Sequence, residues 1–583
     1  MKEIDVSKYF KPNLKNARKR VNKDTLVSNF VLLDKYKDLG VGKTYTVITY
    51  GCQANEADSE VFSGILENLG YERDILENSS DLVIINTCAI RENAEDRTFG
   101  ELGRLMKYKR KNPNMITILA GCMSQEEKVV ERVLQVYPQV DIIIGTHNIY
   151  KLPEYIYNSL FSHERIVEVF SEEGSIIEQL PKIRENKHKA WVNIMYGCDE
   201  FCTYCIVPYT RGKERSRQKE EIIKEVLELI ESGCIEITLL GQNVNAYGKD
   251  FKEINYTFKD LLSDLAKLPI KRIRFTTSHP KDLDFETIKV LGSFDNIMPY
   301  LHLPVQSGSN SILKKMNRHY TIEEYLEKVN YLKKEIPNVS LTTDIIVGFP
   351  NETEEDFLKT LELVDTVKFE GAYTFIYSKR DGTPAATFID SISDLEKKDR
   401  FNRLKEVVDK YYLRGNQRFL GLIEEVLVDE VSKGNEFNLT GYTKNNKRVN
   451  FQGDKNLVGT LVNVKITSAK TWFLMGEIVD NVTYLKYLMA SDPKIIRFRK
   501  LEELINNDPI FKNKINEVKS VQRRRKLNET DENKKKLDET IAVFMDYPLV
   551  REYFDLFDYA KELIDTIKNI IETELSKDIT LER

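Results

Sequence analysis

The stretch Gly197-Cys-Asp-Glu-Phe-Cys-Thr-Tyr-Cys205 decides the fold of the middle of this chain. Its three cysteines have the spacing C-x3-C-x2-C and directly follow an apolar segment, Val192–Met195, that is typical of a β-strand. Thiolates this close in sequence can surround one cube of iron and sulfide. Three thiolates leave one iron of a [4Fe–4S] cube open, and an open iron can be chelated by the amino and carboxylate groups of a small molecule.

Two other uses of these cysteines are a zinc site and a set of redox-active thiols. Structural zinc takes four ligands, yet neither Cys nor His occurs among the 28 residues after Cys205. The spacing therefore favours an iron–sulfur cluster on Cys198, Cys202 and Cys205.

Three more cysteines, Cys52, Cys88 and Cys122, come one to three residues after predicted strands. The carboxyl ends of parallel strands line the ligand crevice of an open α/β sheet. A lone cysteine in such a place is usually a small buried apolar residue, but three at equivalent places predict a second three-cysteine site. We expect the seventh cysteine, Cys234, to pack in the interior, because it lies in a Ser-Gly-Cys turn before a strand.

Upstream of the motif, strand and helix patterns alternate. About residues 41–155 predict a parallel α/β domain, with a helix at Asp58–Leu69 whose apolar residues share one face. Its strands are expected at Thr44–Tyr50, Asp81–Ile85, Met115–Leu119 and Val140–Ile144. Residues 1–40 are expected to form a polar, basic lead-in.

Downstream, the same alternation fills about residues 185–412, where six strands predict an open or partial (β/α)6 barrel. These strands are expected at Trp191–Met195, Glu236–Leu240, Arg272–Thr276, Tyr300–Leu303, Ser340–Val347 and Gly371–Tyr377.

Residues 413–482 contain short strand patterns separated by turns with glycine, which predict a small β-barrel. They are expected at Ile423–Asp429, Phe437–Tyr442, Val449–Phe451, Leu461–Ile466 and Phe473–Glu477. Apolar residues at helical spacing predict a helical extension over residues 485–583, so the fold class is multidomain α/β.

Bulk properties set limits on the class of protein. A chain of 583 residues is too long for one core, and 41% hydrophobic and 31% charged residues are ordinary for a globular protein. No apolar run approaches the roughly 20 residues that span a bilayer, and the start lacks the apolar part of a secretory signal. We therefore expect a cytoplasmic protein with no membrane partner. The net charge of -5 gives no sign of a nucleic-acid partner, which leaves local basic patches as candidates.

Polar residues at the carboxyl ends of the barrel strands are candidates for binding a nucleoside-bearing cofactor. They are Gln242, Asn243, Gln306, Ser307 and Gly348. The loop after the cysteine motif carries Arg211, Arg215 and Arg217, and arginine suits bidentate binding of carboxylates and phosphates. The alternatives are ordinary turn chemistry for the first set and an exposed basic loop for the second. The six histidines show no metal-ligand spacing.

Together these motifs resemble the methylthiotransferase branch of the radical S-adenosylmethionine (SAM) superfamily. The matching stretches are Thr49–Asn55, Asn86–Asn93, Gly121-Cys122, Gly197–Cys205 and Ile206–Arg217. The resemblance covers about residues 41–480 and implies an N-terminal methylthiotransferase domain, a radical SAM partial barrel and a TRAM β-barrel. It also implies two [4Fe–4S] clusters, one on each set of three cysteines, and SAM at the cluster of the C-x3-C-x2-C motif. One departure is Ala54, where Met is commoner in this family.

The residues around Cys52 and Cys88 are similar to those of the tRNA-modifying group of that branch. This similarity implies transfer of a methylthio group to C2 of N6-isopentenyladenosine at position 37 of tRNA, with two SAM consumed. The implied partners are the tRNA anticodon stem-loop and an electron donor such as a flavodoxin or ferredoxin. The basic residues expected to meet the RNA are Arg211, Arg215, Arg217, Lys444 and Lys447.

Two other functions remain open at this point. The same chemistry could act on an aspartate of a ribosomal protein, or the chain could be a non-catalytic iron–sulfur scaffold that binds RNA. The helices of residues 485–583 resemble the YlbF/YmcA family, which implies a protein partner. A helical extension that packs on the enzyme or dimerises fits the same pattern.

Overall fold

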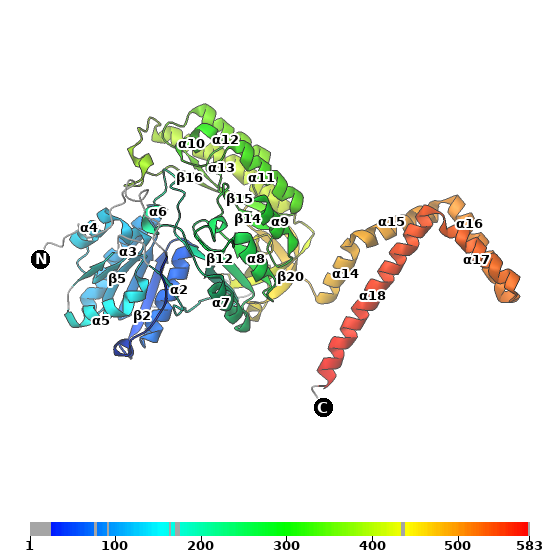
Figure 1. The fold of residues 1–583 in the computed structure, drawn as a ribbon, viewed down its shortest axis with the longest axis horizontal. Coiled ribbons are helices and arrows are strands. Elements are labelled where there is room, and N and C mark those ends of the chain that lie inside the picture. Colours follow the sequence, from blue (N-terminus) through cyan, green and yellow to red (C-terminus); the bar gives the residue numbers. More distant parts are fainter. Residues whose placement is uncertain are drawn as a thin grey trace. The chain divides into compact units, whose positions relative to one another are not determined.

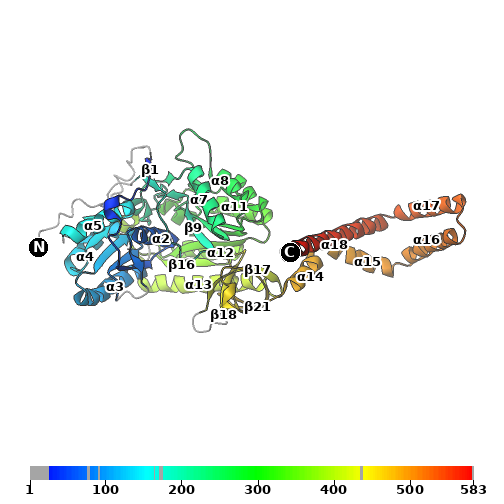
Figure 2. The same ribbon diagram turned by 90° about the horizontal axis from the view of Figure 1, so that it is seen from below.

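The computed structural model describes residues 25–74, 79–89, 92–162, 165–169, 175–432 and 438–580. The chain forms two compact units: the first holds nearly all residues up to Glu477, and the second holds residues 478–583 with 463–465. Figure 1 and Figure 2 show the units from two sides. Parts of three sequence predictions lie outside the described residues: most of the basic lead-in, Ile90 and Arg91 of one matching stretch, and Phe437 of one expected strand.

The N-terminal domain is a six-stranded parallel sheet with helices on both faces (Figure 1). In spatial order its strands are β3 (Glu72–Arg73), β2 (Thr44–Tyr50), β4 (Leu82–Thr87), β5 (Ile116–Gly121), β6 (Ile142–Ile144) and β7 (Ile166–Glu168). Its helices are α2 (Gln53–Asn68), α3 (Glu92–Lys111), α4 (Glu127–Val136) and α5 (Leu152–Ser162). Because successive side chains of a strand point to opposite faces, Leu82 and Ile84 pack with α2 and α5, whereas Val83 and Ile85 pack with α3 and α4. The predicted parallel α/β fold is confirmed.

Several features of this domain differ from the sequence prediction, which gave four of the six strands and missed the short strands β3 and β7. Helix α2 begins at Gln53, five residues earlier than expected, because Cys52 is its N-cap and the Asn55 side chain accepts a hydrogen bond from the Cys52 backbone N–H at 3.3 Å. Strand β1 (Val27–Asn29) pairs in parallel with β8 (Ile176–Glu178), which is distant in the sequence. A three-residue strand carries too short a pattern to be found from the sequence.

The middle of the chain is a partial barrel of six parallel strands. In spatial order they are β9 (Lys189–Asn193), β12 (Glu236–Leu240), β13 (Arg272–Phe275), β14 (Tyr300–His302), β15 (Ser340–Val347) and β16 (Ala372–Ile376). They form two three-stranded sheets, joined where the Ile273 N–H donates to Asn296 O at 2.7 Å and the Met298 N–H donates to Ile273 O at 3.0 Å. The helices that follow the strands are α7 (Lys219–Glu231), α8 (Phe258–Ala266), α9 (Phe285–Ser293), α10 (Asn310–Lys315), α11 (Ile322–Glu335), α12 (Glu354–Val367) and α13 (Asp394–Gln417). The predicted (β/α)6 arrangement is confirmed.

A hairpin after β9 carries the cysteine motif. Its two short strands, β10 (Met195–Tyr196) and β11 (Arg215–Ser216), pair antiparallel, and the short helix α6 (Val207–Thr210) lies in the loop between them. The cysteines and the following basic residues therefore belong to one closed loop, residues 197–214, which we call the cysteine hairpin.

Residues after α13 form a closed five-stranded barrel, as predicted. Its strands, in barrel order, are β17 (Ile423–Val431), β18 (Asn438–Thr443), β19 (Arg448–Gln452), β21 (Leu474–Ile478) and β20 (Leu461–Ala469). Two buried arginines of β13 bind the backbone of this small barrel. Arg272 donates to Tyr442 O and Glu425 O, both at 2.9 Å, and Arg274 donates to Thr443 O at 2.8 Å. The small barrel is thereby fixed to the larger one.

The second unit is helical, as expected. Its helices are α14 (Asn481–Ser491), α15 (Pro493–Asn507), α16 (Pro509–Leu527), α17 (Asp531–Met545) and α18 (Pro548–Thr580). Leu501, Ile505, Phe544 and Val550 form a core of its own. Among the helices that the structure describes, none has the length and apolarity needed to cross a membrane.

Candidate functional site

Three cysteines meet at one edge of the N-terminal sheet. Strands β2, β4 and β5 are neighbours, and their last residues are in register. The structure therefore brings Cys52, Cys88 and Cys122 to the same edge, each one or two residues past the end of its strand. Cys88 is held there because its N–H donates to Tyr50 O at 2.9 Å. Cys88 and Cys122 are buried, and Cys52 is partly exposed.

The backbone at this edge has no room for a side chain at Gly121. Its φ is +99°, and a Cβ atom there would lie 2.4 Å from Asn86 Oδ1 and 2.5 Å from Thr87 O. Asn86 is fixed in turn, because it accepts from Asn55 Nδ2 at 3.1 Å and donates to Asn55 O at 2.8 Å. A glycine before Cys122 is what lets this strand end approach its neighbour.

A buried arginine reaches these thiols from the cysteine hairpin. Arg211 donates from Nε to Cys122 Sγ at 3.0 Å and from Nη2 to Asp58 Oδ2 at 2.7 Å. The Cys88 thiol hydrogen-bonds to Cys52 and, together with the charge of Arg211, lowers the pKa of Cys52 to about 5, against the effect of burial. Burial raises the pKa of Cys122 despite the nearby guanidinium.

The other three cysteines lie in the cysteine hairpin. Gly197 begins it with a φ of +79°, and a Cβ atom there would lie 1.9 Å from Lys213 O on the returning side. The Cys198 N–H donates to Gly212 O at 3.1 Å, which closes the loop around the motif. The Gln242 side chain accepts from the Gly197 N–H at 2.5 Å, so the end of β12 holds the hairpin in place.

A second buried arginine contacts this second group of thiols. Arg318 donates from Nη1 to Cys202 Sγ at 3.4 Å and from Nη2 to Pro304 O at 2.8 Å. Burial raises the pKa of Cys205 to about 12 and shifts the pKa of Cys198 in the same direction. Thiols in such surroundings keep their protons until a metal displaces them.

The residues present fit a [4Fe–4S] cluster at each site. Each site offers three sulfur donors, and each has one guanidinium N–H directed at a cysteine sulfur, which is the kind of outer contact that stabilises a bound cluster. The two sites are neighbours. Cys122 and Ala89 of the N-terminal domain pack in one apolar cluster with Ile206 and Tyr209 of the cysteine hairpin, and Ile206 directly follows Cys205.

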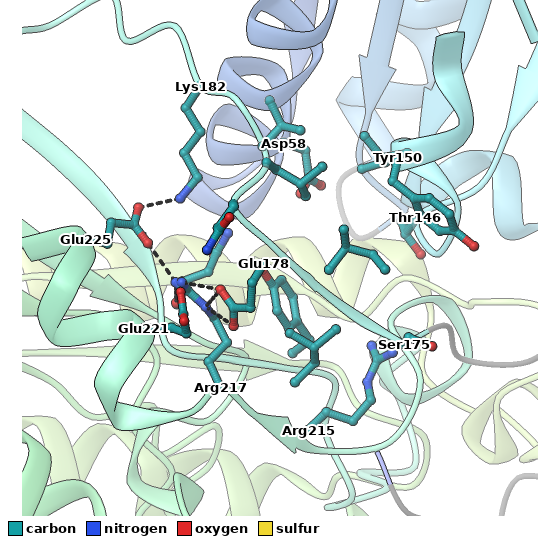
Figure 3. A pocket seen from close by; sticks show the side chains of 18 of the residues that line it. Asp58, Thr146, Tyr150, Ser175, Glu178, Lys182, Arg215, Arg217, Glu221 and Glu225 are labelled. Atoms are coloured by element: carbon teal, nitrogen blue, oxygen red, sulfur yellow. Dashed lines mark hydrogen bonds and ion pairs between the residues drawn. The ribbon is translucent and has the colours of Figure 1, made fainter. Parts of the chain in front are cut away.

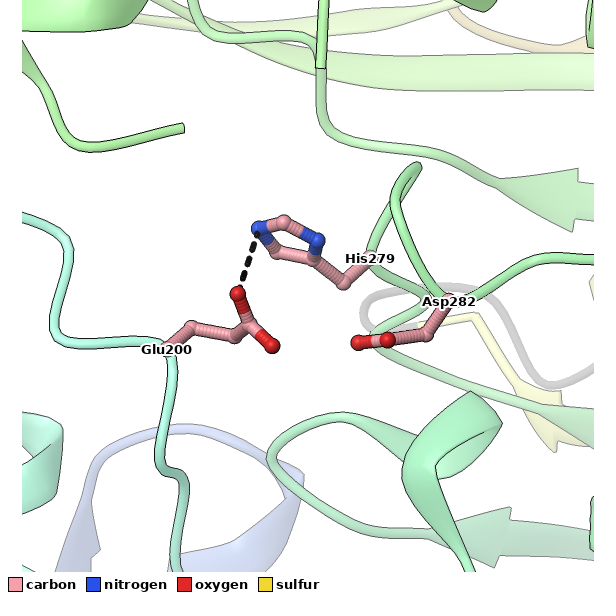
Figure 4. A group of neighbouring side chains, drawn as sticks. All are labelled: Glu200, His279 and Asp282. Carbon is pink, nitrogen blue, oxygen red and sulfur yellow. Dashed lines mark ion pairs between the residues drawn. The ribbon is translucent and has the colours of Figure 1, made fainter. Parts of the chain in front are cut away.

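Next to the motif, sequence reasoning missed a polar group formed by Glu200, His279 and Asp282, drawn in Figure 4. Glu200 lies between the first two cysteines of the motif, and the other two residues follow β13. The ligand atoms of all three lie within 4.8 Å of one another. The sequence offers one indication of them, their position: Thr277-Ser-His-Pro280 follows a barrel strand at its carboxyl end, on the side of the cysteine hairpin.

This polar group does not suit a divalent cation. Lys281 Nζ lies 2.9 Å from Glu200, and Lys249 forms an ion pair with Asp282, so both carboxylates already face ammonium groups. His279 Nδ1 accepts from the Lys281 N–H at 3.3 Å, which leaves the proton on Nε2. Burial, together with the charges of Arg318 and Lys281, holds the pKa of His279 well below its ordinary value. Nε2 lies 3.9 Å from Glu200 Oε2, the pair that Figure 4 marks, which is too far for a hydrogen bond. Within the described residues Nε2 therefore has no hydrogen-bond partner and can donate to a ligand oxygen.

The five residues predicted to bind a nucleoside lie in three different surroundings. Gln242 and Asn243 lie beside the cysteine hairpin and the polar group, where Asn243 Nδ2 donates to Asp282 at 2.5 Å. Gln306 is buried with a φ of +72° and its N–H donates to Asp344 O. The other two are packed against outer helices. Ser307 Oγ lies 3.5 Å from Thr360 Oγ1 of α12, and a Cβ atom at Gly348 would lie 2.6 Å from Lys397 Cγ of α13.

Most of the basic residues expected to meet RNA have partners inside the protein. Arg217 is buried between Glu178 and Glu225, at 2.6 and 2.7 Å. Lys447 is buried and pairs with Glu370 at 3.0 Å. Arg215 is also buried and donates to Arg211 O at 3.1 Å. Of these residues, Lys444 is exposed over 43% of its side chain.

A cavity of about 490 Å³ lies between the N-terminal domain and the barrel (Figure 3). Asp58, Thr146 and Tyr150 line it from one side, and Arg215 and Arg217 line it from the other. Its wall holds both the Arg217 ion-pair network and the Asp58–Arg211 pair, so it separates two charged contacts that join the domains.

Four families have models that match consecutive parts of this chain. They are the uncharacterized protein family UPF0004 over residues 44–145, the radical SAM superfamily over residues 192–364, the TRAM domain over residues 417–479, and the family described as control of competence regulator ComK, YlbF/YmcA, over residues 478–576.

Curated relatives and solved structures were compared as well. The chain is 54% identical over 490 residues to the tRNA-2-methylthio-N(6)-dimethylallyladenosine synthase of Bacillus cytotoxicus, covering 83% of this chain and 96% of the relative. The protein of the same name from Bacillus mycoides is 54% identical over 82% of this chain and 95% of its own length. Among solved structures, the radical SAM methyltransferase TsrM from Kitasatospora setae aligns with a TM-score of 0.46 and 13% identity, over 67% of this chain and 79% of its own. The cobalamin-dependent radical SAM enzyme OxsB aligns with a TM-score of 0.41 and 12% identity, over 92% and 81%.

Proposed function

The chain belongs to the family of tRNA-2-methylthio-N(6)-dimethylallyladenosine synthases, and on this basis we propose that it transfers a methylthio group to C2 of N6-isopentenyladenosine at position 37 of tRNA. It is a radical SAM enzyme with two [4Fe–4S] clusters, and its TRAM domain is a module for RNA. The observation that carries the proposal is the pair of adjacent three-thiol sites linked through the cysteine hairpin.

In this proposal, each set of three cysteines holds one cluster. Cys198, Cys202 and Cys205 hold the cluster at the barrel mouth, and the three strand-end cysteines of the N-terminal sheet hold the auxiliary cluster. When bound, the first cluster supplies the electron that cleaves SAM reductively, and the auxiliary cluster supplies the sulfur. The protein itself binds and orients the clusters and the substrates, and it excludes water from the site.

The side chains around the motif have matching roles. Gln242 fixes the start of the cysteine hairpin, and Arg318 directs an N–H at the Cys202 sulfur. His279 offers an Nε2–H donor to a carboxylate or hydroxyl oxygen of SAM, because it is neutral and forms no hydrogen bond through Nε2 among the described residues, Glu200 Oε2 being 3.9 Å away. Asn243, held by Asp282, borders the same space. Of the five residues predicted to bind the nucleoside, we therefore propose Gln242 and Asn243 as those that border SAM, together with His279.

The partners in this proposal are the tRNA anticodon stem-loop, an electron donor such as a flavodoxin or ferredoxin, and a protein partner of residues 485–583, all in the cytoplasm. Lys444 of the small barrel is the exposed basic residue of the predicted set, so we propose it as a phosphate contact. An enzyme can reach C2 of the adenine only when the base is unstacked from its neighbours. We therefore propose that the adenine turns out of the anticodon loop and enters the barrel mouth.

Mass spectrometry of nucleosides from total tRNA tests the function directly. Deleting the gene should remove the 2-methylthio nucleoside and cause N6-isopentenyladenosine to accumulate. Returning the gene should reverse both changes. An unchanged nucleoside profile would refute the proposal and direct the search to a ribosomal protein substrate or to a binding role.

A further inference from the structure

We propose that Arg211 is a positioning residue of the auxiliary cluster: it fixes the Cys122 side of that site to the cysteine hairpin and stabilises the reduced state of the cluster. The inference deepens the proposed function and rests on its assignment of Cys52, Cys88 and Cys122 as ligands.

The geometry of Arg211 is set on two sides. Nη2 donates to Asp58 Oδ2 at 2.7 Å, and Nε donates to Cys122 Sγ at 3.0 Å. The side chains of Arg211 and Asp58 are only 7% and 9% exposed, so neither contact is shared freely with water. Asp58 belongs to α2, the helix that begins at Cys52, and it therefore holds the guanidinium toward the thiols of its own domain.

The backbone of Arg211 belongs to the other site. Arg211 lies six residues after Cys205, at the end of α6, where its N–H donates to Val207 O at 2.8 Å. Its carbonyl accepts from Arg215 Nη2 at 3.1 Å. A single residue thus connects the loop that ligates one cluster to a ligand sulfur of the other.

Charge explains what this contact does to the cluster. Hydrogen bonds to the sulfurs and the net charge nearby are among the main factors that set the potential of an iron–sulfur cluster. A cation acts strongly on a buried site because the interior screens charge less than water does. Asp58 offsets part of this charge, but its carboxylate binds Nη2 whereas the Nε–H points at the Cys122 sulfur. The hydrogen bond and the remaining positive charge at Cys122 therefore favour the reduced cluster, which carries one more negative charge, over the oxidised cluster.

The proposed reaction has a use for this effect. When a carbon-centred radical takes a methylthio group, the new C–S bond contains the radical's electron and one electron of the sulfur–iron bond. The other electron of that bond would stay on the iron, so a cluster held by Cys52, Cys88 and Cys122 would take up one electron and no further oxidant would be needed. A residue that stabilises the reduced cluster makes this step easier.

The test uses the full chain carrying Cys198→Ala, Cys202→Ala and Cys205→Ala, so that only the auxiliary cluster is present. Iron and sulfide content is measured first, and the midpoint potential is then titrated by electron paramagnetic resonance. Arg211→Gln, which keeps a hydrogen-bond donor but removes the charge, should shift the midpoint to a more negative value. The matched control is Arg318→Gln, a buried arginine at the other site, which should leave the midpoint unchanged.

A second variant covers the case in which Arg211→Gln loses its cluster. Arg211→Lys keeps the charge and should retain iron, with a midpoint between those of the parent and of Arg211→Gln. Iron loss in the glutamine variant with retention in the lysine variant therefore supports the proposal. A glutamine variant with full iron and the parent midpoint would overturn it.

The measurement also separates this inference from the function on which it rests. It requires neither tRNA nor SAM, so it does not depend on the substrate. If the chain with three alanines binds no iron at all, the assignment of the auxiliary ligands fails, and both proposals fall. If it binds iron with an unchanged midpoint in Arg211→Gln, only the role of Arg211 falls.

Discussion

At the scale of single residues, each ligand set depends on a glycine that stands directly before a cysteine. Gly121 and Gly197 both have a left-handed φ, and the backbone oxygens of Thr87 and Lys213 lie 2.5 and 1.9 Å from where their Cβ atoms would be. Any side chain would push the following cysteine away from its partners. The ligand geometry is therefore fixed by the backbone of neighbouring strands as much as by the cysteines.

Replacing Gly121 by alanine should remove the auxiliary cluster selectively. The strain of a left-handed alanine costs about 1–3 kcal/mol, and the contact with Thr87 O adds to it by displacing Cys122. Purified Gly121→Ala protein should contain about half of the parent iron, because one of two equal clusters is lost, and should still produce 5′-deoxyadenosine from SAM without methylthiolating tRNA. Gly233→Ala is the control, because Gly233 has a φ of +88° with nothing within 4 Å of a Cβ atom. If Gly121→Ala protein contained as much iron as Gly233→Ala protein, the backbone at residue 121 would not be what holds Cys122 in place.

Replacing Cys198 by alanine should have the opposite effect. Production of 5′-deoxyadenosine should be abolished, measured by chromatography after reduction, while the auxiliary cluster remains visible by its iron and its spectrum. Cys234→Ala provides the comparison, because Cys234 is buried in the apolar core of the barrel and its thiol donates to the backbone oxygens of His188 and Glu236, at 3.6 and 3.3 Å. That variant should keep all its iron and lose only about 1 kcal/mol of stability. SAM cleavage that survives in Cys198→Ala would refute the ligand assignment.

At the scale of elements, buried charges join the domains of the first unit. Glu225 of α7 accepts from Arg217 at 2.7 Å, from Arg184 at 3.0 Å and from Lys182. Arg217 also pairs with Glu178, the last residue of β8. The network connects α7 of the barrel to the segment that returns from the N-terminal domain, so it sets how the two cluster sites face each other.

Glu225→Gln should lower the free energy of unfolding by about 3–5 kcal/mol at neutral pH, because it leaves buried cations without their partner. Chemical denaturation measures the loss. Glu228→Gln is the control on the same helix, since Glu228 is exposed, and it should change stability by less than about 0.5 kcal/mol.

The stability difference between the parent protein and Glu225→Gln should depend on pH in the acid range. Burial alone would raise the pKa of Glu225, but Lys182 and Arg217 lower it to about 2, below the ordinary value of about 4.3 for an unfolded chain. A lowered pKa means that the carboxylate stabilises the fold fully above about pH 4 and loses this effect as the pH falls toward 2. The stability difference between the parent and Glu225→Gln should therefore shrink in acid. A difference that stays constant from pH 7 to pH 3 would show that the charge is not responsible.

Docking of the small barrel is a second element-scale property. Arg272 is fully buried and binds two backbone oxygens of that barrel, so Arg272→Met leaves Tyr442 O and Glu425 O without these donors, at about 1–3 kcal/mol for each. Amide hydrogen exchange should become faster across β17 and β18, and tRNA affinity should fall because the RNA-binding domain loses its fixed position. Lys271→Met changes the exposed neighbour and should affect neither measurement. Unchanged exchange in Arg272→Met would mean that Arg274 and the other contacts hold the small barrel without Arg272.

At the scale of the whole molecule, the layers could be predicted from the sequence but the contacts between them could not. β2, β12 and β15 were found at their observed bounds, because buried strands leave continuous or alternating apolar patterns. The cysteines could be grouped because parallel strands end at one edge. The position of His279 beside Glu200, and of Arg211 on a thiol of another domain, depends on how domains pack, and no local pattern records that.

The sequence comparison and the division into two units lead to a last prediction. The curated relatives match 82–83% of this chain while covering 95–96% of their own length, so the reaction has no need of a region the size of residues 478–583. That unit also has its own core around Leu501 and Phe544.

A chain ending at residue 480, which keeps all five strands of the small barrel, should therefore restore the 2-methylthio nucleoside in a strain that lacks the gene. Leu501→Asp in the full chain should disrupt the helical core. This variant should nevertheless restore the 2-methylthio nucleoside as well as the parent chain does. If the truncated chain fails while binding both clusters and cleaving SAM, the helical unit takes part in selecting or holding the tRNA, and the affinity for tRNA measured at several salt concentrations would show which contacts it supplies.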